Sequence, residues 1–240
     1  MPWFFAIAER DHEIQNPTSP VKIRLLGERL RLEPESHVLD IACGKGGPTV
    51  ILAREFGCRI TGVERAHEFA SVARERVASA GLDGQVEIVE RDAAELELEP
   101  ARYDVAMCLG ASFVWGGLNA TLRALAPAAK AGGQVVVGEP YWRRWPLPDG
   151  IDDQGFVTLA ETVERFRAAG LTIQTLIASS EDDWDRYESL HWRALEEWLA
   201  ANPDDPDAPE IRRRHETYRD EYLHRGRDLL GWAMFATRKT

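Results

Sequence analysis

Short apolar runs alternate with helical patterns through most of the chain. Seven runs are predicted to be β-strands because they are short, apolar and bounded by turn or charged residues: 38–41, 58–63, 86–89, 103–109, 134–137, 171–177 and 231–237. Apolar residues recur every three or four positions between them and predict helices at 49–54, 71–80, 118–130 and 158–169. Strands that alternate with helices form a parallel sheet covered on both faces, so the pattern predicts an α/β fold.

Two segments lie outside this alternation. Residues 1–35 form an N-terminal extension with one helical pattern, 23–32. A longer insertion, about 181–228, separates the sixth and seventh strands, where a short hairpin would suffice. We predict two helices there with a break at 202–207, and one face of the first helix carries Trp184, Tyr187, His191, Leu195 and Trp198. We therefore expect a single domain over 1–240, with a helical extension and a helical lid.

The most informative stretch joins the first strand to the first helix. The strand runs into a turn that contains Gly44, Gly46 and Gly47, and Pro48 then opens the helix. Glycines in such a turn remove the Cβ atoms that would keep a cofactor away from the backbone. The helix start presents free N–H groups to a carboxylate or phosphate, and a proline fits its first turn. The stretch therefore predicts a cofactor site.

This turn differs from two familiar nucleotide-binding loops. A phosphate-binding P-loop requires glycine at position 39 and Ser or Thr after Lys45, but the chain has Leu39 and Gly46 there. A dinucleotide loop requires a third glycine, and its place is taken by Thr49. The P-loop is excluded, and the dinucleotide loop is only weakly supported.

Acidic residues follow the next two strands. Glu64 ends the second strand, about twenty residues beyond the glycine turn, and a carboxylate there suits the two hydroxyls of a ribose. Asp92 follows the third strand in the same way. A nucleoside-containing ligand is therefore expected at this end of the sheet.

Together these residues resemble the cofactor motifs of class I S-adenosylmethionine (SAM)-dependent methyltransferases. Asp40, Cys43, Gly44 and Gly46 match the first motif, whereas Ala42 stands where that family usually has glycine. Alanine is the smallest change available, and it is tolerated there if its φ is negative. The resemblance implies SAM as the cofactor. It also implies a Rossmann-like, seven-stranded, mostly parallel sheet whose last strand is inserted antiparallel to the others.

The resemblance also gives roles to residues that follow the strands. Glu64 would hold the ribose of SAM, and Asp92 would receive its adenine amino group. The N–H of Ala93 would face the adenine ring, and Leu109 ends the fourth strand, which faces the transferred methyl group. The predicted cofactor-binding set is Asp40, Ala42, Cys43, Gly44, Gly46, Glu64, Asp92, Ala93 and Leu109.

Three further segments resemble a poorly characterised branch of presumed small-molecule methyltransferases: 15–20, 111–117 and 138–142. Open α/β sheets bind ligands at the carboxyl ends of their strands, so the residues predicted to contact the substrate are Ser112, Tyr141 and Trp142. We expect the N-terminal segment to close over the cofactor. We expect the helical insertion to roof the substrate pocket.

Methyl transfer from a sulfonium is an in-line displacement with a neutral leaving group. Alignment of the acceptor with the methyl group can supply most of the acceleration, at ~7–11 kcal/mol. We therefore predict SAM-dependent transfer to a nitrogen, oxygen or sulfur atom of a small molecule. Glu139, placed just past the fifth strand, is the candidate general base. His12 and His191 are weaker candidates, since a lone histidine on a helix is more often structural or exposed.

Two other functions share some of these features. A non-catalytic SAM-binding protein would carry every cofactor motif and would differ only in lacking turnover. A nicotinamide-dependent oxidoreductase would share the fold and Glu64, but Thr49 disfavours it. The sequence therefore favours a methyltransferase, with these alternatives open.

The charge of the chain argues against nucleic acid as a partner. The formal net charge is -11, and the short basic cluster 212–214 lies among Glu210, Glu216 and Asp220. Nucleic-acid binding requires clustered Lys and Arg, so a nucleic-acid substrate is not expected.

Location is predicted from what the chain contains. No apolar run approaches eighteen residues, and the N-terminus lacks the features of a signal peptide. Three cysteines, an odd number, suit neither a disulfide framework nor a zinc site. We expect a cytoplasmic protein with no metal and no membrane partner. The sequence leaves its oligomeric state open.

Overall fold

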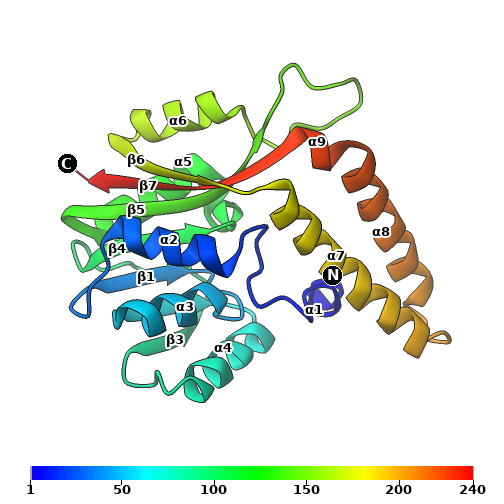
Figure 1. Cartoon of the computed structure of the whole chain (residues 1–240), viewed down its shortest axis with the longest axis horizontal. Coiled ribbons are helices and arrows are strands. Elements are labelled where there is room, and N and C mark those ends of the chain that lie inside the picture. The colour runs from blue at the N-terminus through cyan, green and yellow to red at the C-terminus, as the bar shows by residue number, and fades with distance from the viewer. Residues whose placement is uncertain (1, 240) are drawn as a thin grey trace.

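The structure is a computed structural model that describes residues 2–239, and its centre is a seven-stranded sheet (Figure 1). The strand order is β3-β2-β1-β4-β5-β7-β6, and only β7 runs antiparallel to its neighbours. This arrangement confirms the predicted α/β, Rossmann-like sheet. The strands are β1 (His37–Ile41), β2 (Arg59–Glu64), β3 (Val86–Glu90), β4 (Tyr103–Leu109), β5 (Ala129–Trp142), β6 (Leu171–Ala178) and β7 (Leu230–Lys239).

Helices surround the sheet and extend beyond one end of it. Those that flank the sheet are α2 (Pro20–Leu30), α3 (Gly47–Phe56), α4 (His67–Ser79), the 3₁₀ turn η1 (Ser112–Trp115), α5 (Leu118–Ala128) and α6 (Leu159–Ala168). The remaining ones are α1 (Pro2–Ala8), α7 (Glu181–Ala201), α8 (Ala208–Glu221), the π-helical turn η2 (Tyr222–Gly226) and α9 (Arg227–Leu229). No helix within residues 2–239 is long and apolar enough to cross a membrane.

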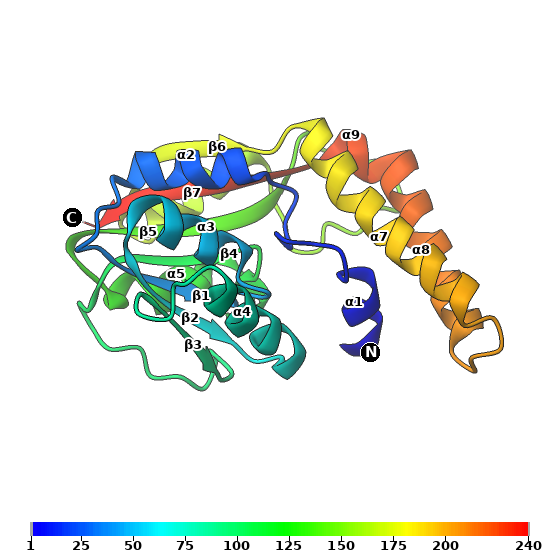
Figure 2. The ribbon, with the colours of Figure 1, turned by 60° about the horizontal axis from the view of Figure 1, so that its bottom comes forward.

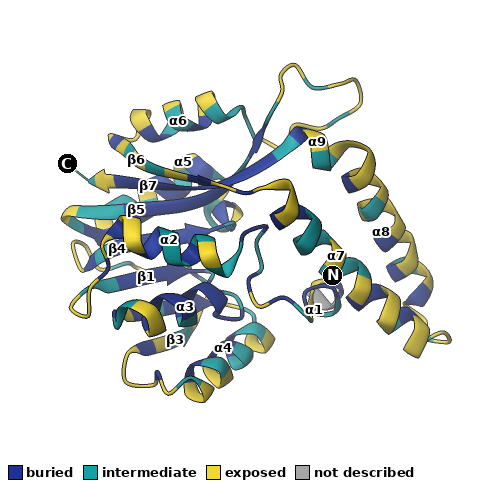
Figure 3. Ribbon diagram, viewed as in Figure 1, coloured by how far each residue is buried: buried dark blue, intermediate teal, exposed yellow. Residues whose placement is uncertain are grey.

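The sheet is buried on both faces, as Figure 3 shows by the dark blue of its central strands. One core joins α2, α3 and α4 to the sheet through residues such as Leu26, Leu52 and Val77. The other joins α5 and α6 to the opposite face through Leu122 and Phe166. This two-sided burial explains why the central strands read as continuous apolar runs.

The helices α7 and α8 form an antiparallel pair that projects from the end of the sheet, with α1 beside it (Figure 2). A third apolar cluster holds the three helices together, and its buried residues are Phe4, Ala8, Leu195, Leu199, Ala208 and Ile211. The helices α7 and α8 begin and end near the positions predicted for the two helices of the insertion. The helix α1 had no counterpart among the predicted elements.

Strand β5 is much longer than the predicted strand 134–137. It begins at Ala129, and a register shift against β4 accommodates residues around Gly132 and Gly133, which had been interpreted as the end of a helix. Beyond Gly138, β4 no longer pairs with β5, so the missing N–H of Pro140 is tolerated on that edge, where the next contact is the bridge of Trp142 with Thr158. The prediction that Glu139 lies after the strand is therefore wrong.

Candidate functional site

The carboxyl ends of β1, β2 and β4 surround a cavity of about 960 Å³, which we call the cofactor cavity. It lies at the point where the strand order reverses between β1 and β4, the usual ligand position in an open α/β sheet. Eight of the nine predicted cofactor residues line it: Asp40, Ala42, Cys43, Gly44, Glu64, Asp92, Ala93 and Leu109. Gly46 does not line it and instead packs tightly against Ala73 of α4.

Ala42 departs from the expected backbone conformation. Its φ is +54°, in the left-handed region, so the condition of a negative φ, under which alanine would replace glycine without strain, is not met. Glycine is the usual residue in that region because a Cβ atom crowds the following carbonyl oxygen. The alanine in this motif therefore carries backbone strain.

The glycines of the turn make room for the N-terminal segment as well as for a ligand. A Cβ atom on Gly44 would lie 2.2 Å from Oε1 of Gln15, and one on Gly110 would lie 1.9 Å from Oδ1 of Asn16. The Gln15 side chain accepts a hydrogen bond from the N–H of Lys45 at 2.7 Å. Gln15 and Asn16 both line the cofactor cavity, so this segment forms part of its wall.

Lys45 anchors the segment that follows α1. Its buried ammonium donates hydrogen bonds to the backbone carbonyls of Glu9, Arg10 and His12, at 2.6, 2.9 and 3.2 Å. Arg76 of α4 contacts the carbonyl of His12 at 3.4 Å from the other side. Lys45 thus ties the N-terminal segment to the glycine turn.

The two acidic residues expected to bind a nucleoside are held by backbone groups. Glu64 is buried, and its two carboxylate oxygens accept hydrogen bonds from the N–H groups of Gly44 and Ala66, at 3.0 and 2.8 Å. Asp92 is partly exposed, and its Oδ1 accepts the N–H of Ala94 at 2.9 Å. Glu64 therefore fixes the glycine turn against the end of β2.

Burial perturbs the ionisable groups beneath the cavity. Asp40 is 2 % exposed and accepts a hydrogen bond from Thr49 at 2.6 Å. Burial, reinforced by the nearby charge of Glu64, raises the pKa of Asp40 to about 7. Burial also raises the pKa of the Cys43 thiol well above its usual range, so this cysteine is a poor nucleophile at neutral pH.

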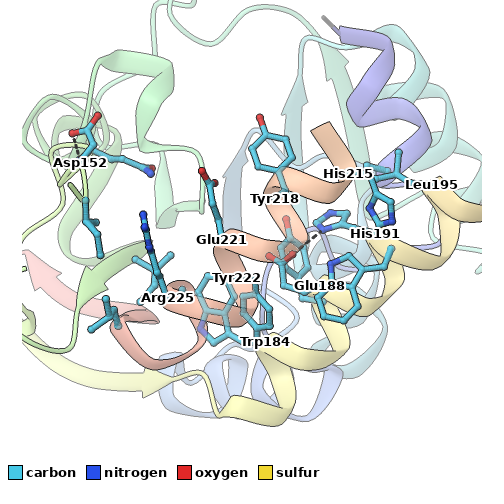
Figure 4. Close-up of a pocket in the computed structure, with 18 of the residues that line it drawn as sticks. Asp152, Trp184, Glu188, His191, Leu195, His215, Tyr218, Glu221, Tyr222 and Arg225 are labelled. Atoms are coloured by element: carbon cyan, nitrogen blue, oxygen red, sulfur yellow. Dashed lines mark hydrogen bonds and ion pairs between the residues drawn. The ribbon is translucent and has the colours of Figure 1, made fainter. Parts of the chain in front are cut away.

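A second cavity of about 540 Å³ lies between the end of β5 and the helices α7 and α8 (Figure 4). We call it the aromatic cavity, because its lining includes Phe4, Phe5, Trp142, Trp184, Tyr187, Trp192, Tyr218 and Tyr222. Acidic side chains stand at its sides, among them Asp152, Glu188 and Glu221. Phe5 and Tyr187 line both cavities, so the two spaces adjoin.

The predicted substrate residues are divided between the two faces of the sheet. Trp142 lines the aromatic cavity, with its indole N–H bonded to the carbonyl of Asp153 at 3.1 Å. Tyr141 belongs to the apolar core on the opposite face, because successive side chains of a strand point to opposite sides. The prediction that Tyr141 and Trp142 share a pocket is corrected accordingly.

Ser112 and Glu139 form a buried pair on the same face as Tyr141. The Ser112 hydroxyl donates to Oε1 of Glu139 at 3.1 Å, and Oε2 of Glu139 has no hydrogen-bond partner within the described part of the chain. Burial raises the pKa of Glu139 to about 7. Neither residue lines the two cavities described above.

A polar cluster at the boundary of the two cavities was not predicted as a site. Oε1 of Glu9 accepts hydrogen bonds from the Tyr187 hydroxyl at 3.1 Å and from Nε2 of His191 at 3.0 Å. Burial alone would lower the pKa of His191, but the carboxylates of Glu188 and Glu9 raise it to about 9. The spacing of Tyr187 and His191 on one helical face was visible in the sequence. Their partner Glu9 was not, because α1 had not been predicted.

Known proteins resemble this chain over its full length. Residues 38–133 match a family model described as a methyltransferase domain. The uncharacterized protein YjhP of Escherichia coli K12 is 33% identical over 243 residues, with 98% of each chain covered. A SAM-dependent methyltransferase from Thiobacillus denitrificans, crystallised with S-adenosyl-L-homocysteine, is 34% identical with a TM-score of 0.94, covering 100% of this chain and 99% of the other. Another from Geobacter sulfurreducens, with the same ligand, is 33% identical with the same TM-score and coverage.

Proposed function

The chain belongs to the SAM-dependent methyltransferases, and from that premise we propose that it methylates a small molecule held in the aromatic cavity. The observation that carries this proposal is the junction of the two cavities at Phe5 and Tyr187. A methyl donor in one cavity and an acceptor in the other would meet there. The partner is proposed to be a small molecule because the aromatic cavity has the size and apolar lining typical of such sites.

The donor set of the cofactor cavity fits SAM. Asp40, Ala42, Cys43 and Gly44 supply an acidic residue and a turn without bulky side chains at the end of β1. We propose that Glu64 receives the ribose hydroxyls and that Asp92 and the N–H of Ala93 receive the adenine edge, with Leu109 near the methyl group. Gly46 supports the turn from behind through its contact with Ala73.

SAM supplies a methyl group on a sulfonium whose departure leaves a neutral thioether. The work proposed for the protein is therefore to align the acceptor and to exclude water, and alignment can contribute ~7–11 kcal/mol. The walls formed by Trp142, Trp184 and Trp192 suit an acceptor with apolar or cationic surface, since indole faces attract cations. The helices α7 and α8 are proposed to act as the roof that excludes water.

Glu139 remains our candidate general base. Its buried carboxylate has one unpartnered oxygen, and a pKa near 7 suits proton acceptance at neutral pH. Because Glu139 and Ser112 lie on the sheet face opposite Trp142 and line neither cavity, contact with a substrate in the aromatic cavity requires this end of the sheet to rearrange. If alignment alone drives transfer, replacement of Glu139 will leave the rate of turnover largely intact.

A turnover screen tests the proposal. Small amines, phenols, thiols and carboxylic acids are incubated with SAM, and release of S-adenosylhomocysteine is measured. For an acceptor that turns over, Trp142→Ala should lower kcat/KM by about tenfold or more, since an aromatic wall contributes roughly 1.5–3 kcal/mol. Trp145→Ala is the matched control, because Trp145 is 56 % exposed and lines neither cavity. Equal losses in the two variants, or no turnover with any acceptor class, would contradict the proposal.

A further inference from the structure

Three side chains that commonly bind metals meet at the boundary of the two cavities. Glu9 and His12 come from the end of α1 and the segment after it, and His191 comes from α7, which lies beside α1 (Figure 2). One ligand atom from each residue lies within 4.8 Å of the other two. We propose that Glu9, His12 and His191 together bind one divalent transition-metal ion.

The first argument is an unsatisfied pair of acceptors. Nε2 of His12 lies 2.9 Å from the carbonyl oxygen of Tyr187, so this nitrogen carries the proton and donates it. Nδ1 of His12 and Oε2 of Glu9 are both buried, and neither has a hydrogen-bond partner among the residues that the structure describes. Buried polar atoms are rarely left unpaired, because their desolvation is not compensated. An ion between these two atoms would satisfy both.

The second argument is the distance between those atoms. Oε2 of Glu9 and Nδ1 of His12 are 3.4 Å apart. Two ligands of a tetrahedral ion with bonds of ~2.1 Å are separated by roughly 3.4 Å. The gap therefore already has the width of one edge of a metal site. Nε2 of His191 lies 3.0 Å from the other oxygen of this carboxylate, Oε1, which keeps the third ligand within 4.8 Å of the other two.

The third argument is the support around the histidines. A histidine that binds a metal through one nitrogen usually has its other nitrogen held by a carbonyl or carboxylate. His12 is held by the Tyr187 carbonyl, and Nδ1 of His191 lies 3.8 Å from Glu188, as the dashed line in Figure 4 marks. The Tyr187 hydroxyl fixes Glu9 through its other oxygen. Hydrogen bonds therefore orient His12 and Glu9, and His191 has a carboxylate at ion-pair distance from its second nitrogen.

The chemistry of the donors selects the ion. Two imidazoles and one carboxylate suit Zn²⁺, Co²⁺, Ni²⁺ or Fe²⁺, whereas Mg²⁺ and Ca²⁺ prefer oxygen ligands. Binding displaces the proton that His191 donates to Glu9, as metal binding to histidine generally does. Three protein ligands leave a position for water or for an oxygen of a bound molecule. Glu9 lines the cofactor cavity and His191 the aromatic cavity, so both spaces reach the ion.

Metal binding is measured on the full chain after treatment with a chelator. Calorimetric titration with Zn²⁺ should give one ion per chain, and titration with Co²⁺ should give visible absorption bands of a bound ion. Glu9→Gln and His191→Gln should lose this binding at concentrations that saturate the wild type. Zn²⁺ should also raise the melting temperature of the wild type and not of the variants. Binding of S-adenosylhomocysteine is measured on the same metal-free protein. This second measurement distinguishes a failure of the metal-site proposal from a failure of the methyltransferase proposal.

The matched control is His215→Gln. His215 is also a buried histidine paired with a glutamate, with Nε2 3.0 Å from Glu196, but it lies outside the cluster. Its replacement should leave Zn²⁺ binding unchanged. Circular dichroism checks that each variant is folded, and if Glu9→Gln is not, His191→Gln decides. Absence of one-to-one binding in the wild type would overturn the proposal, as would unchanged binding in a folded His191→Gln.

Discussion

At the scale of single residues, the sequence identified most of the cofactor cavity but not the strain in its wall. Glu64, Asp92 and the residues at the end of β1 were predictable because acidic strand ends and glycine turns are local signals. The φ of Ala42 was not, because alanine gives no local sign of a left-handed conformation. Likewise, the sequence showed the aromatic pair Tyr141 and Trp142. Because the strand was predicted to end before them, the sequence did not show that they alternate between the two faces of β5.

The strain at Ala42 gives a stability prediction. Ala42→Gly should raise the free energy of unfolding by about 1 kcal/mol, because glycine has no Cβ and adopts a positive φ without crowding the following carbonyl oxygen. Thermal denaturation should then show a melting temperature higher by ~2–4 °C. Ala80→Gly is the control, since Ala80 has φ of -88° and gains nothing from glycine. If Ala42→Gly is less stable than the wild type, the alanine side chain stabilises the fold by more than its strained backbone destabilises it.

The buried carboxyl of Glu139 predicts a dependence of stability on pH. Its native pKa of about 7 lies above its ordinary value, so the native state holds a proton that the unfolded state has lost. The protonated Glu139 therefore stabilises the native state in acid. About 3 kcal/mol of the free energy of unfolding is lost as the pH rises through 7. Glu139→Gln keeps an acceptor for Ser112 and cannot ionise. The stability of Glu139→Gln relative to the wild type should rise by about 3 kcal/mol from about pH 4 to pH 8, as measured by denaturant titration. Parallel pH curves would contradict this assignment.

At the scale of elements, local periodicity succeeded where an element buries a continuous apolar surface. The strand β4 is buried inside the sheet, and the helices α7 and α8 bury apolar faces against each other and α1. It failed where tertiary contacts decide the structure. The helix α1 is held by α7 and α8 through apolar contacts distant in sequence. The strand β5 continues past Gly132 and Gly133 because β4 pairs with it before them, at Ala129, and after them, from Gln134.

The connection between α1 and the glycine turn gives a prediction about dynamics. Lys45→Met removes the ammonium that binds three carbonyls at the end of α1. Hydrogen exchange over residues 2–16 should become roughly a hundredfold faster, because lost hydrogen bonds to a charged group cost about 2–3 kcal/mol locally. Lys130→Met, which breaks the half-exposed pair with Asp104, should leave exchange in this segment unchanged. Equal exchange in wild type and Lys45→Met would show that the apolar cluster alone holds α1.

At the scale of the whole molecule, the sheet topology and the family followed from the order of strands, helices and motifs. The contact between the two cavities could not be predicted from this order, because it depends on how three helices from opposite ends of the chain pack together. Residues 4–9 and 184–195 meet only in the folded protein, and they form the boundary between the cofactor cavity and the aromatic cavity. This boundary is where we propose that methyl transfer occurs.

A crystal structure of the chain with S-adenosylhomocysteine tests this proposal most directly. The ribose should contact Glu64 and the adenine should contact Asp92 and Ala93. The sulfur should face the opening between Phe5 and Tyr187, toward the aromatic cavity. A sulfur that faces away from that opening, with the aromatic cavity closed off from the ligand, would contradict the proposed arrangement of donor and acceptor.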